Sequence, residues 1–307
     1  MLVATAAGLI FFWFLPRPKP LEVSASAAEI KYWKALNEPM KEMSATELKS
    51  DVRVKALCDR ASQILAKVKQ ICDDFHLQFV GPMKFSPTEG SISEMRSTLR
   101  SPDAFFYFSL PTQQLEIWEN FALGHHLDSS TNPSSYKSPI EQQWSQDKAM
   151  QIGTAFLHAF LNGADVKLDQ GNAQFVSNEL EYHTNTWFFR WTRLDSHGYR
   201  FFNNVFTVQV PQGYGPVRVN FPKITPYVEE KGTMMSRGWA FAIASRVKSA
   251  SPFRDWSISN SSETAPVIVG DHLMWEFSVY TSRGNYAESA SIFIDAYTGE
   301  YELYAPI

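Results

Sequence analysis

Histidines are the first residues of this 307-residue chain that could do chemistry, because imidazole binds metals and carries protons near neutral pH. His125 and His126 are adjacent in a predicted loop, and His158 lies on the flank of a predicted helix. Neighbouring side chains on an extended segment point apart, and no HExxH or paired Cys/His spacing accompanies them. A solvated loop therefore explains the pair better than a metal site, and we predict no metal and no cofactor.

Paired carboxylates are the second candidate for chemistry. Glu179 and Glu181 lie two residues apart on a predicted strand, so they share a face, as acid–base pairs must. An exposed sheet face explains them equally well. The sequence contains no G-x-S-x-G, no P-loop and no G-x-G-x-x-G. We predict a non-catalytic protein, and the alternative is an enzyme that uses an aromatic cleft between structural units.

Composition limits the remaining functions. With 44% hydrophobic and 20% charged residues the chain is globular, and a net charge of -4 without a Lys/Arg stripe argues against a nucleic-acid partner. The two cysteines, Cys58 and Cys72, fall in one predicted helix, where 14 residues correspond to about 21 Å of rise. A disulfide needs Cα atoms within about 7 Å, so we predict two free thiols at the edge of a core.

The N-terminus begins with an uncharged apolar run, Leu2 to Leu15, that is followed by a proline-rich stretch, Pro16 to Pro20. The run rises about 21 Å as a helix, which suits a signal-peptide core or a minimal anchor better than a full span of about 30 Å. For residues 1–16 three interpretations stay open: an uncleaved anchor, a signal cleaved near Ala25-Ser26-Ala27, or a soluble segment. Residues 17–45 are predicted as a Pro-rich spacer and a short helix.

Behind this segment the hydrophobic pattern predicts three helix-plus-sheet units, at 46–124, 136–230 and 231–307. The first has a helix at about Ser50–Asp74 with apolar residues every three or four positions. A polar loop, His126 to Pro139, separates it from the second. The predicted strands of the first unit are Leu77–Val80, Met95–Leu99, Ala104–Leu110 and Gln114–Phe121.

The second and third units share a pattern. Ser145 is a predicted N-cap for a helix that ends at Asn162-Gly163, and Ser236 begins the corresponding helix of the third unit. Met274–Tyr280 aligns with the strand Thr186–Thr192. The other predicted strands are Gln174–Tyr182, Tyr199–Val210 and Val217–Phe221, followed by Val267–Val269, Ser291–Asp295 and Glu300–Leu303. We therefore predict an α+β fold of tandem units, each a helix packed on a three- to four-stranded antiparallel sheet.

Aromatic residues of the second unit have two interpretations. Trp187, Trp191, Tyr199 and Phe201 form a ligand-binding face if their side of the sheet is open, or the core if a helix covers it.

The third unit resembles PepSY-type domains, which have a cystatin-like fold. The resemblance rests on the helix start Ser236–Ala240, the strand Trp275–Tyr280 and the closing hairpin IFIDAYTGEYEL, whose Asp295, Thr298 and Gly299 match the family's turn. Asp can bond the backbone ahead of it, and Gly accepts the left-handed conformation. The resemblance extends from Thr233 to Ile307 and, faintly, over the second unit.

This resemblance implies a non-catalytic, usually extracytoplasmic module that binds or restrains a protein partner. A membrane segment before tandem units is also similar to single-pass, cell-wall-associated regulators of Gram-positive bacteria. Arg17 and Lys19 alone would keep the body cytoplasmic, but the resemblance favours the other side. We expect a membrane-anchored, extracytoplasmic binding or regulatory protein, tethered by residues 2–15, with an unknown protein partner such as an envelope enzyme. The alternative is a structural part of an envelope assembly.

Overall fold

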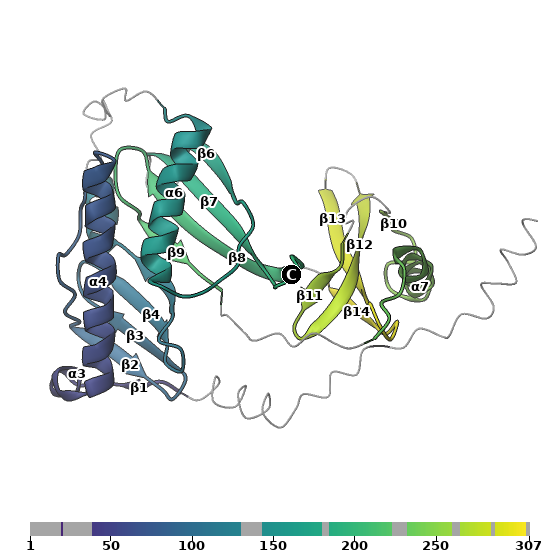
Figure 1. Cartoon of the computed structure of the whole chain (residues 1–307), viewed down its shortest axis with the longest axis horizontal. Helices are drawn as coiled ribbons and strands as arrows, with labels where there is room; N and C mark the ends of the chain where they lie inside the picture. Colours follow the sequence, from purple (N-terminus) through teal and green to yellow (C-terminus); the bar gives the residue numbers. More distant parts are fainter. Residues whose placement is uncertain are drawn as a thin grey trace, which may run out of the picture. The chain divides into compact units, whose positions relative to one another are not determined.

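The computed structural model describes Pro20 and residues 39–129, 143–179, 184–222, 232–259, 265–283 and 286–304 (Figure 1). The fold is mixed α+β, with a few helices and mainly antiparallel strands. Within these ranges no helix is long and apolar enough to cross a membrane. The predicted segment 2–15 lies outside the described residues, as do Ala25-Ser26-Ala27 and most of the predicted spacer.

The described chain divides into two compact units. The N-terminal unit contains residues 39–193 and 204–222, and the C-terminal unit contains Pro20, residues 194–203 and the residues from 232 to 304. Strand β8 (Arg200–Pro211) therefore contributes its first residues to the C-terminal unit and the rest to the N-terminal unit. The predicted boundaries at 46–124, 136–230 and 231–307 stay predictions.

The described residues of the N-terminal unit form the helices α3 (Ala45–Ser50), α4 (Val52–Asp74), α5 (Phe121–Ser129) and α6 (Gln146–Leu161). The predicted first helix is confirmed as α4, which begins after the N-cap Asp51 and buries its apolar stripe, including Val54 and Ile64. Cys58 and Cys72 are free thiols on this helix, as predicted. Helix α5 was not predicted. The Asn120 side chain accepts a hydrogen bond from the Leu123 amide at its start, so the expected loop is helical as far as Ser129.

The strands of the N-terminal unit are ordered β1-β2-β3-β4-β5-β9-β8-β7-β6. They span Lys41–Glu42 (β1), Glu89–Ile92 (β2), Arg96–Arg100 (β3), Phe105–Ser109 (β4), Leu115–Glu119 (β5), Asn172–Glu179 (β6), Thr184–Leu194 (β7) and Arg218–Asn220 (β9). Two predictions were wrong in detail. The segment Leu77–Val80 makes a single bridge, from Gln78 to Tyr214, rather than a strand, and β2 was missed because EGSI has weak strand propensity.

Helices α4 and α6 lie side by side over one face of this sheet (Figure 1). Lys67 Nζ of α4 donates to Asn162 Oδ1 at the end of α6, over 2.5 Å. Between the helices and the sheet, Phe156 of α6 belongs to one continuous hydrophobic core with Trp118 and Phe189 of the strands. The helices of the first two predicted units thus share a core.

The close approach of α6 to β7 depends on Gly153. A Cβ at this position would lie 2.4 Å from Cδ1 of Phe189, whose ring is fully buried. The ring cannot withdraw without disturbing Trp187 and Trp191, which stack on either side of it with centroids 6.3 and 6.1 Å away. A small residue is therefore required where the helix crosses the strand.

The C-terminal unit contains α7 (Arg237–Ala250) and strands β10 (Ser257–Ile258), β11 (Val267–Val269), β12 (His272–Arg283), β13 (Tyr286–Asp295) and β14 (Tyr301–Tyr304). Strands β11 to β14 form an antiparallel meander, and β10 pairs with the second half of β12. The first residues of β8 pair in parallel with β11, through Arg200 and Phe201. Helix α7 packs on one face of this sheet, against residues such as Phe277 and Ile292.

Helices α6 and α7 begin in the same way, each after a serine N-cap. Ser145 accepts from the Lys148 amide and Ser236 from the Trp239 amide, each as an N-cap. Four residues after each cap, Ala149 and Ala240 are fully buried.

Replacement of Gly153 by Ala should destabilise the protein by about 1 to 3 kcal/mol, because the new methyl group overpacks α6 against Phe189. Thermal unfolding followed by far-UV circular dichroism would measure the loss. The matched control is Gly238→Ala, also in a helix, where the added methyl group would have no atom within 4 Å and no loss is expected. Equal stability of the two variants would contradict the packing argument.

Candidate functional site

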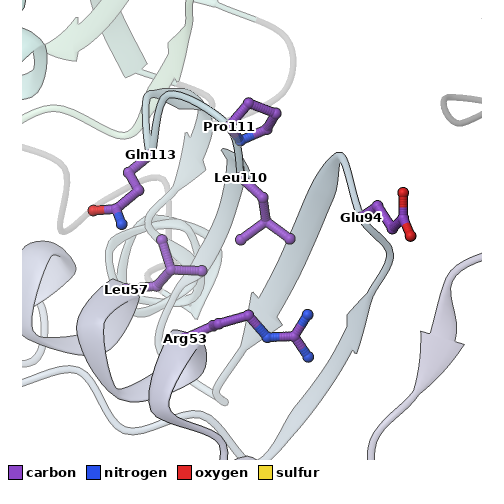
Figure 2. Close-up of a pocket in the computed structure, with 6 residues that line it drawn as sticks. All are labelled: Arg53, Leu57, Glu94, Leu110, Pro111 and Gln113. Carbon is purple, nitrogen blue, oxygen red and sulfur yellow. The ribbon is translucent and has the colours of Figure 1, made fainter. Parts of the chain in front are cut away.

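A shallow hollow of about 240 Å³ opens beside the first two turns of α4 (Figure 2). Its lining comes from three places in the sequence: Arg53 and Leu57 from α4, Glu94 from the β2–β3 turn, and Leu110, Pro111 and Gln113 from the β4–β5 turn. Leu57, Leu110 and Pro111 supply apolar surface, and the other three supply one cation, one carboxylate and one amide. The hollow is thus apolar inside with polar groups around it.

Arg53 is held in place by its neighbour Asp51. The Nε of Arg53 donates to Asp51 Oδ1 over 3.2 Å, and Nη2 donates to Oδ2 over 2.7 Å, so the two side chains form a bidentate pair. The side-chain hydrogen bonds from Arg53 lower the pKa of Asp51 to about 2. Because Asp51 also caps α4 by accepting the Arg53 amide over 2.8 Å, the guanidinium is fixed to the start of the helix.

Glu94 and Gln113 complete the polar groups of the hollow, and both are exposed. Within the described ranges the Glu94 carboxylate makes no hydrogen bond or ion pair. Gln113 occupies a left-handed turn conformation, with φ 51°, which directs the chain back into β5. An arriving molecule thus meets the fixed guanidinium of Arg53 and the exposed carboxylate of Glu94.

A second hollow, of about 230 Å³, lies on the other side of Arg53. Here Lys41 Nζ donates to Glu47 Oε1 over 2.6 Å, and Ser44 and Glu47 form a reciprocal capping box at the start of α3. These contacts lower the pKa of Glu47 to about 2, the hydrogen bond from Lys41 being the largest cause. The lining residues are Lys41, Met43, Glu47, Ser50, Asp51, Arg53 and Ile92.

The side chains that line these hollows supply apolar contacts, charges and hydrogen-bonding groups. Shallow, partly apolar depressions with a preorganised arginine accept side chains of another protein, and arginine is enriched at the centre of such interfaces.

The four aromatic residues predicted as a binding face do not form one surface. Trp187 and Trp191 are 2% and 3% exposed and belong to the core of the N-terminal unit. Phe201 is buried, and Tyr199 packs beside it, in the core of the C-terminal unit. The Trp187 Nε1 donates to Gln212 Oε1 over 2.9 Å. Burial under helices gives these side chains the role of core, the second of the two interpretations.

The turn Asp295–Gly299 has the predicted backbone chemistry. Asp295 Oδ1 accepts from the amides of Tyr297 and Thr298 over 2.9 and 2.7 Å, and Gly299 is left-handed with φ 77°. Asp295 Oδ2 lies 3.2 Å from Nδ1 of His272, and Asp295 is 1% exposed. Burial by itself raises the pKa of Asp295, but hydrogen bonds from His272 and the turn outweigh it and lower that pKa. The carboxylate thus stabilises the β13–β14 hairpin.

The other predicted groups lie apart from the hollow. His125 and His126 are on α5 rather than in a loop, and His126 meets the edge of the Tyr214 ring. Among the residues that the structure describes, no cluster of His, Cys, Asp or Glu is arranged to bind a metal ion. Glu181 and the side chain of Glu179 lie outside the described residues.

One half-buried carboxylate had no sequence signal. Glu116 sits at an irregular position of β5, where the register with β4 shifts. Burial raises its pKa to about 7, and the charge of Arg96 opposes that rise. The alternation of side chains along a strand is interrupted at a β-bulge, so the sequence does not show which face of the sheet Glu116 occupies. The surroundings of its carboxylate are evident only from the structure.

Comparison with known proteins gives little support to any assignment. No family model and no curated protein matches the chain. A solved structure, the Bacillus megaterium YpeB C-terminal domain, is similar over 78% of this chain and 96% of its own length, with 12% identity and a TM-score of 0.32. A similarity at this level carries no argument about function.

Replacement of Asp295 by Asn should destabilise the β13–β14 hairpin by about 1 to 3 kcal/mol at pH 7, since the amide keeps an acceptor oxygen but loses the charge. The pKa of Asp295 is lowered in the folded protein, so its contribution is complete above the unfolded value of about 3.9 and is lost as pH falls through the folded value. The difference between variant and wild type should therefore shrink in acid.

Hydrogen exchange of hairpin amides at pH 7 and at low pH would measure this difference. The matched control is Asp271→Asn, on the other side of the His272 ring, where the carboxylate is 62% exposed and only a small effect is expected. A constant difference across pH would show that the Asp295 charge does not stabilise the hairpin.

Proposed function

We propose that the chain is a non-catalytic, membrane-tethered, extracytoplasmic binding or regulatory protein that acts through protein–protein contacts. The observation that carries the proposal is the hollow beside α4, where a fixed arginine borders apolar side chains and the exposed carboxylate of Glu94. Such a site recognises a side chain or short segment of another protein by combining apolar contact with paired charges.

The fixed geometry of Arg53 matters for this role. An arginine that is already oriented loses less side-chain entropy when a partner binds, so more of the contact energy appears as affinity. The Asp51 carboxylate supplies this orientation by accepting hydrogen bonds from Nε and Nη2, which lie on one edge of the guanidinium group. A partner carboxylate or carbonyl would approach the remaining N–H groups, while a partner cation would meet Glu94.

The finer architecture in this proposal is a tandem of cystatin-like units. Its support is the matched start of α6 and α7, each of which lies on an antiparallel sheet. The resemblance of the Asp295–Gly299 turn to PepSY-type domains gives the expectation of an extracytoplasmic regulator and of an envelope enzyme as a partner.

Site-specific photo-crosslinking tests the hollow. A benzoylphenylalanine at Gln113, introduced into the full chain in membranes of its source, should give one discrete protein adduct. The same residue at Lys55, which is exposed on α4 but lines neither hollow, is the control and should not give that adduct. An identical adduct from both positions, or none from Gln113, would remove the hollow as the binding site.

Two variants sharpen this test. Arg53→Ala should reduce the Gln113 adduct about tenfold or more, as loss of a central interface arginine does. Asp51→Asn keeps an N-cap residue but weakens the ion pair with Arg53, so we expect a smaller reduction of the Gln113 adduct than in Arg53→Ala. Far-UV circular dichroism of both variants controls for folding.

A reporter fusion tests the placement. Alkaline phosphatase joined after Ile307 should be active and should sediment with membranes in a bacterial host, because the reporter folds only outside the cytoplasm. An inactive fusion would mean that Arg17 and Lys19 set the orientation, and the extracytoplasmic role would be withdrawn.

A further inference from the structure

Helix α7 covers one face of the sheet of the C-terminal unit, and among the residues that the structure describes no helix of this unit covers the other face. On β12 the residues Leu273, Trp275 and Phe277 pack toward α7, so the alternate residues of β12 lie on the opposite face. At one end of that opposite face Met274 and Phe293 are buried in a small cluster with Phe202. At the other end the side chains are tyrosines and serines.

Two exposed tyrosines mark this second end. Tyr280 of β12 is 50% exposed and Tyr304 of β14 is 37% exposed. The ring of Tyr304 is oriented by two contacts: it meets Phe202 edge-on with centroids 5.2 Å apart, and its hydroxyl accepts from Asn203 Nδ2 over 3.2 Å. At least one of the two aromatic rings is therefore held ready for contact.

Serine hydroxyls lie between the tyrosines. In one row across the strands Ser278 pairs with Ser291, which pairs with Tyr304. In the next row Ser257 and Ser289 stand on either side of Tyr280. We name these six residues the tyrosine–serine face: Ser257, Ser278, Tyr280, Ser289, Ser291 and Tyr304.

The hydroxyls of this face have capacity for a ligand. Ser291 donates to Glu276 Oε1 over 2.8 Å, which leaves its lone pairs as acceptors. In the part of the chain that the structure describes, no side-chain hydrogen bond is formed by Ser257, Ser278 or Ser289. Each of these three hydroxyls can donate once and accept twice.

The charges near this face are few and mainly paired. Glu276 is 9% exposed and is bound by Arg200 Nη2 over 2.9 Å. Glu302 of β14, the cross-strand neighbour of Phe293, adds a second carboxylate. These carboxylates would repel a negative polymer, and the tyrosine rings together with the serine hydroxyls suit an uncharged molecule with many hydroxyl groups.

We infer that the tyrosine–serine face binds a polysaccharide strand. The C–H side of a sugar ring is apolar and stacks on an aromatic ring, while the hydroxyls at its rim exchange hydrogen bonds with serine. This function goes beyond the proposed protein contacts, uses a different unit of the chain and stands if those contacts are disproved.

The spacing of the tyrosines defines the length of ligand. Tyr280 and Tyr304 are separated by two strand spacings of about 4.8 Å and by two residues of about 3.4 Å each, or about 12 Å in all. One sugar ring cannot contact both. A strand of several sugars places different rings on the two tyrosines and spans the serines between them.

Calorimetric titration of the full chain in detergent micelles with chitohexaose and with cellohexaose tests the inference. At least one hexasaccharide should bind, and N-acetylglucosamine or glucose alone should bind at least tenfold more weakly. Tyr280→Ala and Tyr304→Ala should each weaken hexasaccharide binding about 2- to 10-fold. Tyr280→Phe keeps the ring and should bind within about twofold of wild type.

The matched control is Tyr107→Ala, which removes a partly exposed tyrosine from β4 of the N-terminal unit and should leave saccharide binding unchanged. Absence of binding to both hexasaccharides would overturn the inference. Unaltered affinity in the folded Tyr280→Ala/Tyr304→Ala double variant would overturn it too, because the sugar would then bind elsewhere.

Discussion

The packing of an apolar helix stripe on one face of an antiparallel sheet is the constraint on which both units depend. Side chains of a strand alternate between two faces, so a helix can bury only one of them. In the N-terminal unit the approach is close enough that Gly153 replaces any larger residue against Phe189. In the C-terminal unit α7 buries Phe277 and Ile292. Part of the other face of the C-terminal sheet is exposed, at the end of β12 that carries Tyr280.

Elements with a strong local signal could be predicted. The stripe of α4 and the caps Ser145 and Ser236 depend on residues within a few positions of one another, and the turn Asp295–Gly299 uses its own backbone. The helix α5 could not be predicted in this way. Its start depends on the Asn120 side chain, which also donates to the carbonyl of Val80 over 2.7 Å, so a long-range contact holds the cap.

The hollow beside α4 shows why a site escapes a reading of the sequence. Its polar groups, Arg53, Glu94 and Gln113, come from one helix and two turns, and no spacing in the sequence relates them. Only the order of β2 to β5 brings the two turns to the same end of the helix. The charges themselves are ordinary in the sequence, and their significance arises from the fixed position of Arg53.

The aromatic residues also show what the sequence pattern leaves undetermined. The alternation of side chains indicates that Trp187 and Trp191 share a face of the sheet and that Tyr280 and Phe277 of β12 lie on different faces. It does not indicate which face a helix will cover. Burial decides the role: 2% exposure makes Trp187 part of a core, and 50% exposure makes Tyr280 a surface for contact. The hydrophobic effect buries one set of aromatic residues, which stabilise the fold. Another set, on strands of the same kind, stays exposed and can stack on a ligand. The two candidate surfaces differ accordingly in their physics, since the hollow relies on exposed charges that salt screens, whereas the tyrosine–serine face relies on stacking and neutral hydrogen bonds that salt hardly affects.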